Sequence, residues 1–508
     1  MDVLTTAIGN AFSLQIILYA VMGVFLGITV GAIPGLSGDM AIALLLPLVY
    51  KIAPGSSIAM LLGIYKGSMF GGSISAISFG VPGTAAAAAT TEDGYAAKLA
   101  GKPNQALMTA LYSSVTGDVF SDLVLIFLAI PMASVALQFG PVEFFALYVF
   151  SLMLISILTL GKISKGLVAA AIGLFIGAVG MDPLIGSPRY VFGIRQLRGG
   201  IPLVPLLVGI FALPELIIQF AKEWEKIVSR KMNEAVSHAA FLGYDTTKDQ
   251  MSFRIYLSTL KATMIGAGIG TFIGALPGAG SSLAAYVSYG MAKKFSKHPE
   301  NFGKGSLEGV AAPEAGNSAT CGATFIPLFA FGIPGSATAA LFGAALIMQG
   351  INPGPTMIAE NTLIIYTLFV ILIYANFINL GLSRMLIPLY ARLSMIRAKY
   401  LVPAVFAIAL LGTYAANNSI IDVWVVLLAG ILGIALRKNG FPLGPLVLGY
   451  IIGPGAERAL RQALLLGKGD WTFLLKSPIA VSLYIASLAF ILFVRLTSRK
   501  TPVPLEED

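Results

Sequence analysis

Small polar residues gather around the Pro-Gly dipeptides that begin at Pro34, Pro82, Pro277 and Pro334. Their hydroxyls, amides and exposed backbone groups suit the recognition of an anion, with or without a small cation beside it, rather than bond breaking. Each single hydroxyl fits helix capping equally well, so the prediction depends on the whole group. The predicted substrate-binding residues are Gly35, Ser37, Gly38, Gly72, Ser73, Ser75, Gly83, Thr84, Gly278, Ser281, Asn317, Ser318, Gly335 and Ser336.

Four carboxylates in or beside apolar stretches are the candidates for cation or proton coupling: Asp39, Asp118, Asp122 and Glu314. Carboxylates inside a membrane are functional candidates by default. Asp39 fits a helix cap before Met40 equally well. Asp118 and Asp122 share one helix face, and a hydrated interface would also suit them. The expected coupling ion is Na⁺ or H⁺, with no other metal and no cofactor.

The composition indicates that a lipid bilayer surrounds these residues. Of the 508 residues, 57% are hydrophobic and 11% are charged, against about 25% charged residues in soluble domains. The net charge of +9 is assigned to basic loops that orient helices across the membrane, and not to nucleic-acid binding. The first basic residue is Lys51, so residues 11–33 are expected to be a retained span rather than an export signal.

Apolar stretches recur along the chain and predict an all-α polytopic membrane protein with about 10–12 transmembrane helices, some of them re-entrant or broken. The clearest candidates are residues 13–33, 106–130, 142–160, 165–181, 201–220, 255–275, 318–333, 361–390, 400–415, 420–436 and 476–496. Residues 40–50 would reach only about 17 Å as a helix, which predicts a half-helix. The polar segment 222–254 and the basic loop 293–304 are expected to be cytoplasmic.

Two motifs repeat in the same order in the two halves of the chain. GVFLGITVGAIPGLSG (23–38) matches GAGIGTFIGALPGAGS (266–281) at an offset of 243 positions, since Pro34 corresponds to Pro277. FGVPGTAAAAA (79–89) matches FGIPGSATAAL (331–341) at an offset of 252 positions. Two matches in register predict a duplication, and the resulting structural repeats are expected to have inverted topology.

The paired helix breaks predict a transporter site. Proline removes a backbone donor, and broken backbone at membrane depth is tolerated only inside protein or along a watery cavity. Paired breaks in two halves are typical of a transporter binding site. The glycines spaced by four before each break also fit plain helix packing.

Several long motifs resemble the large membrane subunit of the tripartite tricarboxylate transporters. They are GAIPGLSGDMAIALLLP (31–47), YKGSMFGGSISAISFGVPGTAAAAATTEDGY (65–95), GMDPLIGSPRYVFG (180–193), the segment 308–355 and the segment 440–470. The resemblance covers about residues 15 to 475. The family's polar positions fall on Ser37, Gly72, Ser73, Gly83, Thr84, Asp93, Gly94, Tyr95, Glu314, Asn317, Pro334 and Gly335. Ser78-Phe79-Gly80 and Gly316 depart from the family's usual residues.

The resemblance implies a secondary transporter of citrate-like di- or tricarboxylates in a bacterial inner membrane, driven by a Na⁺ or H⁺ gradient. It also implies two partners, a small four-helix membrane subunit and a periplasmic solute-binding protein. We expect a first repeat at 15–220, a polar loop at 221–254, a second repeat at 255–475, and a final helix with a polar tail at 476–508. The expected mechanism is alternating access around the four breaks.

Two alternatives belong to other functional classes. Gly35-Leu36-Ser37-Gly38 fits the GxSG motif of rhomboid-like intramembrane serine proteases. That mechanism needs a base next to the serine, yet His238 and His298 both lie in polar loops. A passive anion channel is the second alternative, because channels also contain re-entrant half-helices. The sequence has no GxxxxGK[ST] loop for ATP hydrolysis.

Overall fold

A computed structural model describes most of the chain. The described residues are 2–33, 36–49, 51–158, 163–218, 221, 249–393, 406–407, 410–415 and 417–497. Pro34, Gly35, most of the predicted polar loop and most of the predicted span 400–415 lie outside them.

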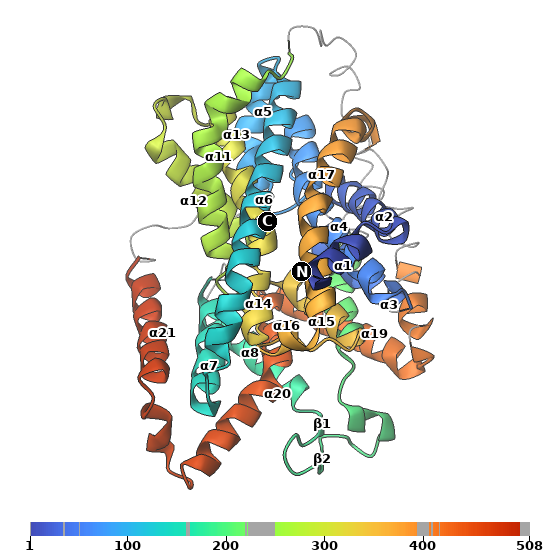
Figure 1. Ribbon diagram of the computed structural model, residues 1–508, viewed down its shortest axis with the longest axis vertical. Helices are drawn as coiled ribbons and strands as arrows, with labels where there is room; N and C mark the ends of the chain where they lie inside the picture. Colours follow the sequence, from blue (N-terminus) through green and yellow to red (C-terminus); the bar gives the residue numbers. More distant parts are fainter. Residues whose placement is uncertain are drawn as a thin grey trace. The chain divides into compact units, whose positions relative to one another are not determined.

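The described chain is almost entirely helical, as predicted (Figure 1). The elements up to residue 212 are α1 (Asp2–Ala11), α2 (Leu14–Ala32), α3 (Gly38–Val49), α4 (Pro54–Phe79), α5 (Ala88–Leu99), α6 (Pro103–Ala136), α7 (Pro141–Leu158), α8 (Ile163–Gly177), β1 (Gly180–Met181), β2 (Pro188–Arg189), η1 (Arg195–Gly199), α9 (Leu203–Leu207) and η2 (Val208–Ala212). The later elements are α11 (Phe253–Gly274), α12 (Gly280–Phe295), η4 (Pro299–Asn301), α13 (Leu307–Ala323), α14 (Phe325–Phe331), α15 (Ala337–Met348), α16 (Met357–Glu360), α17 (Thr362–Leu393), α19 (Ile420–Lys438), α20 (Leu443–Leu466), η5 (Trp471–Leu475) and α21 (Pro478–Thr497). The strands β1 and β2 form one antiparallel pair.

The helices confirm an all-α polytopic membrane protein. Among the described residues, four helices are long and apolar enough to cross a bilayer: Leu14–Ala32, Pro103–Ala136, Thr362–Leu389 and Ile420–Lys438. Six shorter apolar helices accompany them, including α3, which has the short length expected of a half-helix. The number of membrane crossings stays a prediction.

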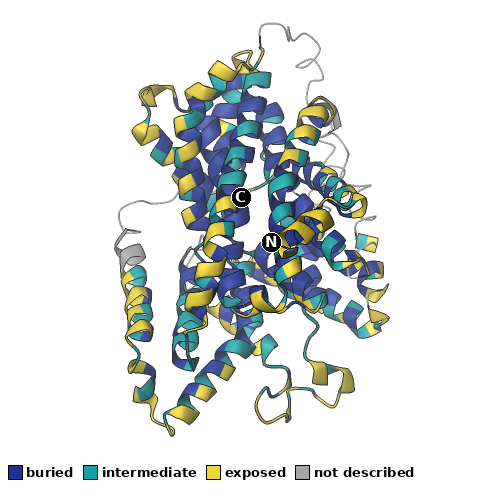
Figure 2. Cartoon of the chain, in the orientation of Figure 1, coloured by how far each residue is buried: buried dark blue, intermediate teal, exposed yellow. Residues whose placement is uncertain are grey.

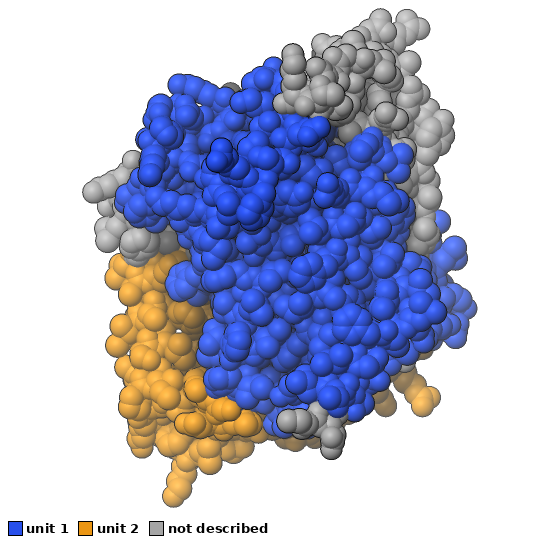
Figure 3. Space-filling model, turned by 45° about the horizontal axis from the view of Figure 1, so that its top comes forward, with its two compact units in different colours: residues 1–133, 202–276, 280–435 blue, residues 134–201, 277–279, 436–508 orange. Residues whose placement is uncertain are grey.

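The chain packs as two compact units, coloured separately in Figure 3. Unit 1 comprises residues 1–133, 202–276 and 280–435, and unit 2 comprises residues 134–201, 277–279 and 436–508. The division follows packing within the chain. The boundaries of the two sequence repeats therefore stay a prediction.

The repeated glycines pack equivalent helix pairs in unit 1. A methyl group on Gly23 or Gly27 of α2 would lie 2.2 Å or 2.3 Å from a carbonyl oxygen of α4, at Met60 or Ile64. A methyl group on Gly266 or Gly270 of α11 would lie 2.2 Å from the carbonyl oxygen of Ala312 or Gly316 of α13. Met60 and Ile64 precede Ala312 and Gly316 by the same 252 positions that separate the second pair of motifs. Both halves thus use glycine for the same close backbone approach.

The two halves also exchange a helix within unit 1. Helix α5 of the first half contacts α12 and α13 of the second, while α15 of the second half contacts α3 and α4 of the first. These contacts are reciprocal, because α3, α4 and α5 correspond in the repeat to α12, to α13 with α14, and to α15. The reciprocal packing supports the predicted duplication. The inversion of topology stays a prediction.

Helix α4 is a deeply buried helix of the site and was absent from the predicted spans. It is buried along nearly its whole length. Buried residues, which are dark blue in Figure 2, fill the interior of unit 1. Its glycines, serines and Lys66 lower its hydropathy, because its neighbours are protein rather than lipid. Helix α20 was missed as well, and it packs on α7 and α8 in unit 2.

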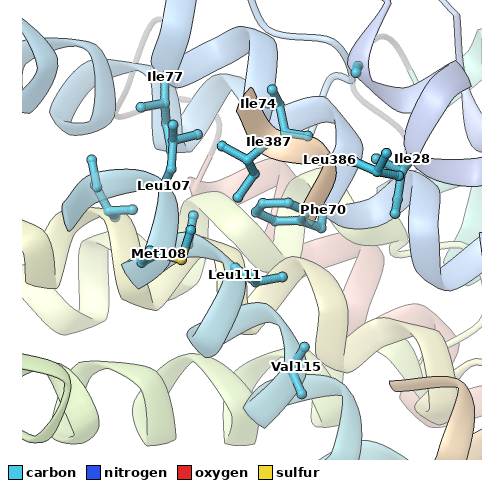
Figure 4. Close-up of a cluster of buried hydrophobic side chains, with 14 of the residues drawn as sticks. Ile28, Phe70, Ile74, Ile77, Leu107, Met108, Leu111, Val115, Leu386 and Ile387 are labelled. Atoms are coloured by element: carbon cyan, nitrogen blue, oxygen red, sulfur yellow. The ribbon is translucent and has the colours of Figure 1, made fainter. Parts of the chain in front are cut away.

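An apolar cluster fixes three helices that carry the polar site described below. Phe70 and Ile74 of α4, Leu111 of α6 and Leu386 and Ile387 of α17 pack together (Figure 4). Lipid tails are as apolar as these side chains, so the cluster stabilises the helix contacts through close van der Waals packing rather than through removal of surface from water. The cluster therefore sets how α4, α6 and α17 lie against one another.

Candidate functional site

The second and fourth Pro-Gly breaks end their helices in the same way. Helix α4 ends at Gly80, with φ of 70°, and α14 ends at Gly332, with φ of 71°. Glycine tolerates this left-handed conformation without the strain that a Cβ atom brings. The chain then leaves each helix at an equivalent point and passes through Pro82 or Pro334.

Each of these breaks closes on the end of the first helix of its own repeat. A methyl group on Gly83 would lie 2.2 Å from the carbonyl oxygen of Gly31. A methyl group on Gly335 would lie 3.1 Å from the carbonyl oxygen of Gly274. Gly31 and Gly274 correspond in the repeat, as do Gly83 and Gly335. The two repeated motifs of each half therefore meet in space.

A hydroxyl group after each of these breaks accepts a hydrogen bond from a backbone amide three residues later. The amide of Ala87 donates a 3.3 Å hydrogen bond to Oγ1 of Thr84, and the amide of Ala339 donates a 3.1 Å hydrogen bond to Oγ of Ser336. Ser336 is therefore the N-cap of α15, whereas the bond to Thr84 closes a turn before α5, whose N-cap Ala87 has no side-chain cap. Ser336 also accepts a 3.0 Å hydrogen bond from Thr324.

Gly72 and Ser75 belong to the second break. A methyl group on Gly72 would lie 2.7 Å from Oγ1 of Thr84, and the amide of Gly83 donates a 3.1 Å hydrogen bond to the carbonyl oxygen of Gly72. The buried Ser75 hydroxyl donates to that same carbonyl oxygen. The structure thus brings Gly72, Ser75, Gly83 and Thr84 together, as the sequence predicted for residues around one break.

At the first break, Ser37 is the residue that caps α3. Its Oγ accepts a 3.2 Å hydrogen bond from the amide of Met40. Asp39 instead accepts a hydrogen bond from the Thr338 hydroxyl of α15. Gly38 packs on Ser68, whose Oγ would lie 2.1 Å from a methyl group on Gly38. Gly35 was predicted to bind substrate but lies outside the described residues.

The protease alternative gains no support from this geometry. Ser37 is engaged with Met40, and His298 lies exposed beside Glu300, 3.4 Å away. His238 lies outside the described residues.

The third break falls in unit 2. Gly278 has φ of 81°, and a methyl group there would lie 2.0 Å from the Ile155 side chain of α7, in the same unit. Ser281 is half-buried at the start of α12 in unit 1. The proximity of Gly278 to the other breaks stays a prediction.

Glu314 of α13 joins the two halves inside unit 1. Its Oε1 accepts a 2.5 Å hydrogen bond from Ser73 of α4 and another from Thr90 of α5. Asn317, one turn later, donates a 3.2 Å hydrogen bond to the carbonyl oxygen of Met69. Among the described residues, no donor reaches Glu314 Oε2 or Asn317 Oδ1. Two buried side-chain oxygens of α13 therefore have no hydrogen-bond donor among the described residues.

Asn317 has a polar neighbour in Ser318, which pairs with another helix. The Oγ atoms of Ser318 and Ser114 of α6 lie 2.6 Å apart. Ser73, Asn317 and Ser318 are thus all engaged with partners from the opposite half of the chain.

Asp118 and Asp122 share a partner that the sequence reasoning missed. Nζ of Lys66 donates to Asp118 Oδ1 at 2.9 Å and to Asp122 Oδ2 at 2.8 Å. It also donates to Oδ1 of Asn376 at 3.2 Å. All three charged side chains are buried, so the hydrated-interface alternative for the two aspartates is not what the structure shows.

Among the partner residues that the sequence did not predict, one had a recognisable signal in the sequence. Lys66 is a lysine between small and apolar residues, and an intramembrane lysine is a functional candidate by default. Thr90, Thr338 and Asn376 carried none, because their partners lie more than 200 positions away in the sequence.

An ion-pair network in unit 2 holds the hairpin of β1 and β2. Arg461 donates to Asp182 at 2.8 Å, and Arg189 donates to Glu457 at 2.7 Å. The backbone amides of Ile185 and Leu184 and the Arg461 guanidinium lower the pKa of Asp182 to about 2. The motif 180–193 therefore has a structural role beside any other.

One described cavity lies away from the predicted binding residues. A cavity of about 280 Å³ in unit 1 is lined by Pro202, Ala344, Thr413 and Asp422, among others, and includes none of the predicted binding residues. The described residues also contain no group of three His, Cys, Asp or Glu side chains placed to hold a metal ion. Na⁺ or H⁺ as the coupling ion stays a prediction.

Comparison with known proteins identifies the family. The model of the Tripartite tricarboxylate transporter TctA family matches residues 17–448. The chain is 37% identical over 497 residues to an uncharacterized 52.8 kDa protein of the TAR-I ttuC' 3'region in Agrobacterium vitis, covering 97% of this chain and 96% of that protein. It is 37% identical over 242 residues to an uncharacterized protein of the TAR-II ttuC' 3'region in the same organism, covering 47% of this chain and all of that protein. No solved structure matches the chain. The chain belongs to the tripartite tricarboxylate transporter TctA family.

Proposed function

We propose that this large membrane subunit imports citrate-like di- or tricarboxylates by symport with Na⁺ or H⁺ across a bacterial inner membrane. A periplasmic solute-binding protein delivers the substrate, and a small four-helix membrane subunit completes the system. Family membership supports a tripartite transporter as the setting. The substrate, the coupling and the cycle are the proposed parts.

The observation that carries the proposal is the matched closure of Gly83 on Gly31 and of Gly335 on Gly274. Broken backbone inside a membrane protein exposes N–H and C=O groups that can bind ions. The Gly83 contact is tight enough to leave no space for a carboxylate between its atoms. Substrate binding there requires each loop to move away from the end of α2 or α11.

Buried and half-buried hydroxyls and an amide beside these loops supply the ligands in the proposed open state. In that state the substrate replaces the present hydrogen-bond partners of Ser73, Thr84, Asn317 and Ser336. The substrate thus interacts differently with the open and the closed state, which alternating access requires. Asp39, Asp118, Asp122 and Glu314 are the proposed sites of cation or proton coupling.

Transport by reconstituted vesicles tests the proposal. The chain is purified with its small subunit and placed in liposomes, and labelled citrate and the binding protein are added outside. Accumulation above the external concentration that needs both the binding protein and an ion gradient is the expected result. A passive channel would give citrate movement that only equilibrates and ignores the gradient. No movement of citrate at all would overturn the assigned substrate class.

A further inference from the structure

Three helices of unit 1 bring a lysine, two aspartates and an asparagine into one buried cluster. Lys66 comes from α4, Asp118 and Asp122 come from α6, and Asn376 comes from α17. The side chains of Lys66 and Asp122 are 0% exposed, and that of Asp118 is 4% exposed. The apolar cluster of Figure 4 holds the same three helices together.

Lys66 has no donor left for a further carboxylate oxygen. Its ammonium group has three N–H bonds, and these reach Asp118, Asp122 and Asn376. Asp122 Oδ2 accepts from both Lys66 and Asn376. Asp122 Oδ1 is also buried, and no donor among the described residues reaches it.

The charges of the cluster do not balance when all three groups are ionised. One ammonium and two carboxylates leave one negative charge, and an uncompensated buried charge is strongly disfavoured. Two carboxylates that share a site favour keeping a proton on one of them. A proton makes the cluster neutral.

We propose that the cluster of Lys66, Asp118 and Asp122 binds one proton, held on the Asp122 carboxyl group, and that this proton is the coupling ion. The inference rests on the proposed function and names its ion. Lys66 acts as the permanent counter-cation, so the cluster alternates between neutral and singly negative forms during transport.

The surroundings of Asp122 favour a proton over a metal cation. Hard cations bound by protein need several oxygen ligands, whereas Asp122 Oδ1 is the one oxygen of Asp122 and Asn376 left without a partner among the described residues. The ionisable groups near the carboxylate pair are Lys66 and Tyr65 of α4, Asp118 of α6 and Cys321 of α13. Helix α17 faces the pair with the Asn376 amide.

The cluster is linked to the Pro-Gly loops through α4. Two turns beyond Lys66, the same helix carries Gly72, which accepts the amide of Gly83, and Ser73, which bonds Glu314. Movement of the second break therefore acts on the helix that holds the counter-cation. In the proposed step, one O–H bond forms between Asp122 and a proton from water on the outer side. That bond breaks on the inner side, and the proton returns to water.

Infrared spectroscopy of the purified protein tests the bound proton without any substrate. A protonated carboxyl group absorbs apart from a carboxylate, so the wild-type spectrum minus that of Asp122→Asn should show one protonated carboxyl band at neutral pH. Asp118→Asn should lose the same band, because Lys66 then balances the one remaining carboxylate. Lys66→Met should double it. Glu360→Gln, which removes an exposed carboxylate, should leave it unchanged. A spectrum that neither aspartate substitution alters would overturn the proposal.

Transport in the vesicles described above tests the coupling, using labelled citrate and a pH dye trapped inside. Wild-type protein should accumulate citrate when the outside is acidic and sodium is absent, and the interior should acidify. Asp122→Asn should still let citrate move down its own gradient but lose accumulation. Acidification that persists in this variant would mean that citrate carries the proton itself. Citrate accumulation that follows a Na⁺ gradient at equal pH would overturn the proton and leave the transporter intact. No citrate movement by wild-type protein would instead overturn the proposed function.

Discussion

Oγ of Ser73 donates a 2.5 Å hydrogen bond to Oε1 of Glu314, which lies 241 positions later in the sequence. The bond joins α4 of the first half to α13 of the second, beside the second Pro-Gly break. Thr90 of α5 donates to the same oxygen. Glu314 is therefore an acceptor that holds two first-half helices against one second-half helix.

The side-chain carbonyl of glutamine can replace this acceptor. We expect Glu314→Gln to keep most of the thermal stability, because its Oε1 atom can accept from both hydroxyls. Glu314→Ala leaves two buried hydroxyls without an acceptor as well as a cavity, which should lower stability by about 2–5 kcal/mol. Unfolding of both variants in detergent measures the difference. Equal losses for both would show that the hydrogen bonds contribute nothing measurable.

Two glycines on α11 offer a matched test of close helix packing. A methyl group on Gly270 would lie 2.2 Å from the carbonyl oxygen of Gly316, whereas one on Gly268 would have nothing within 4 Å. Gly270→Ala should destabilise the protein by about 1–3 kcal/mol through overpacking. Gly268→Ala should be neutral or stabilise by up to about 1 kcal/mol, because alanine favours helix. Melting temperatures of the two variants give the comparison, and a similar drop for both would refute the packing of α11 on α13.

Bulky apolar side chains should block the proposed binding residues. Ser73→Leu, Thr84→Leu, Asn317→Leu and Ser336→Leu should each abolish citrate uptake while the protein still inserts into the membrane. The reason is that each position lies beside a closed loop or at the contact between halves. Ser258→Leu, on an exposed face of α11, is the control for the added bulk. Normal uptake by all four variants would show that the site is elsewhere.

The hairpin network should give stability that depends on pH. Because the pKa of Asp182 in the fold is about 2, below its ordinary value of 3.8, its contribution is fully present above 3.8 and is lost as pH falls through about 2. Asp182→Asn should therefore lower the melting temperature near neutral pH, and the gap to wild type should narrow as pH falls below about 4. Melting curves across this range check the trend. A gap that widens with acid would contradict it.

The fold was predictable from its sequence where lipid or glycine sets the pattern. The boundaries of α2 and α11 follow from apolar runs that end near a Pro-Gly dipeptide, and the repeat follows from glycines at constant spacing. Helix α4 was not predicted as a span, because protein rather than lipid surrounds it. Its hydropathy therefore says little about its burial. The same limit explains why Gly83 and Gly335 were predicted as loop residues without their contacts to α2 and α11.

The candidate site was predictable by residue type but not by pairing. Asp118, Asp122 and Glu314 stood out as carboxylates in apolar surroundings. Their partners Lys66, Thr90 and Asn376 are determined by which helices meet, and that depends on packing between distant segments. Asp39 shows the same limit. A helix cap was one of its two predicted roles, and Ser37 fills that role instead.

The exchange of α5 and α15 between the halves sets an order on biosynthesis. Residues 54–99 leave the ribosome more than 200 positions before residues 307–348 do, which is a delay on the order of 10–50 s at about 5–20 residues per second. Lys66 can meet Asp118 and Asp122 during that interval, since all three belong to the first half. Ser73 and Thr90 cannot meet Glu314 until the second half has been made. The nascent first half therefore contains a lysine paired with two aspartates, but the hydroxyls of Ser73 and Thr90 still lack their Glu314 acceptor. Its polar face must be shielded in the membrane until α13 has been synthesised.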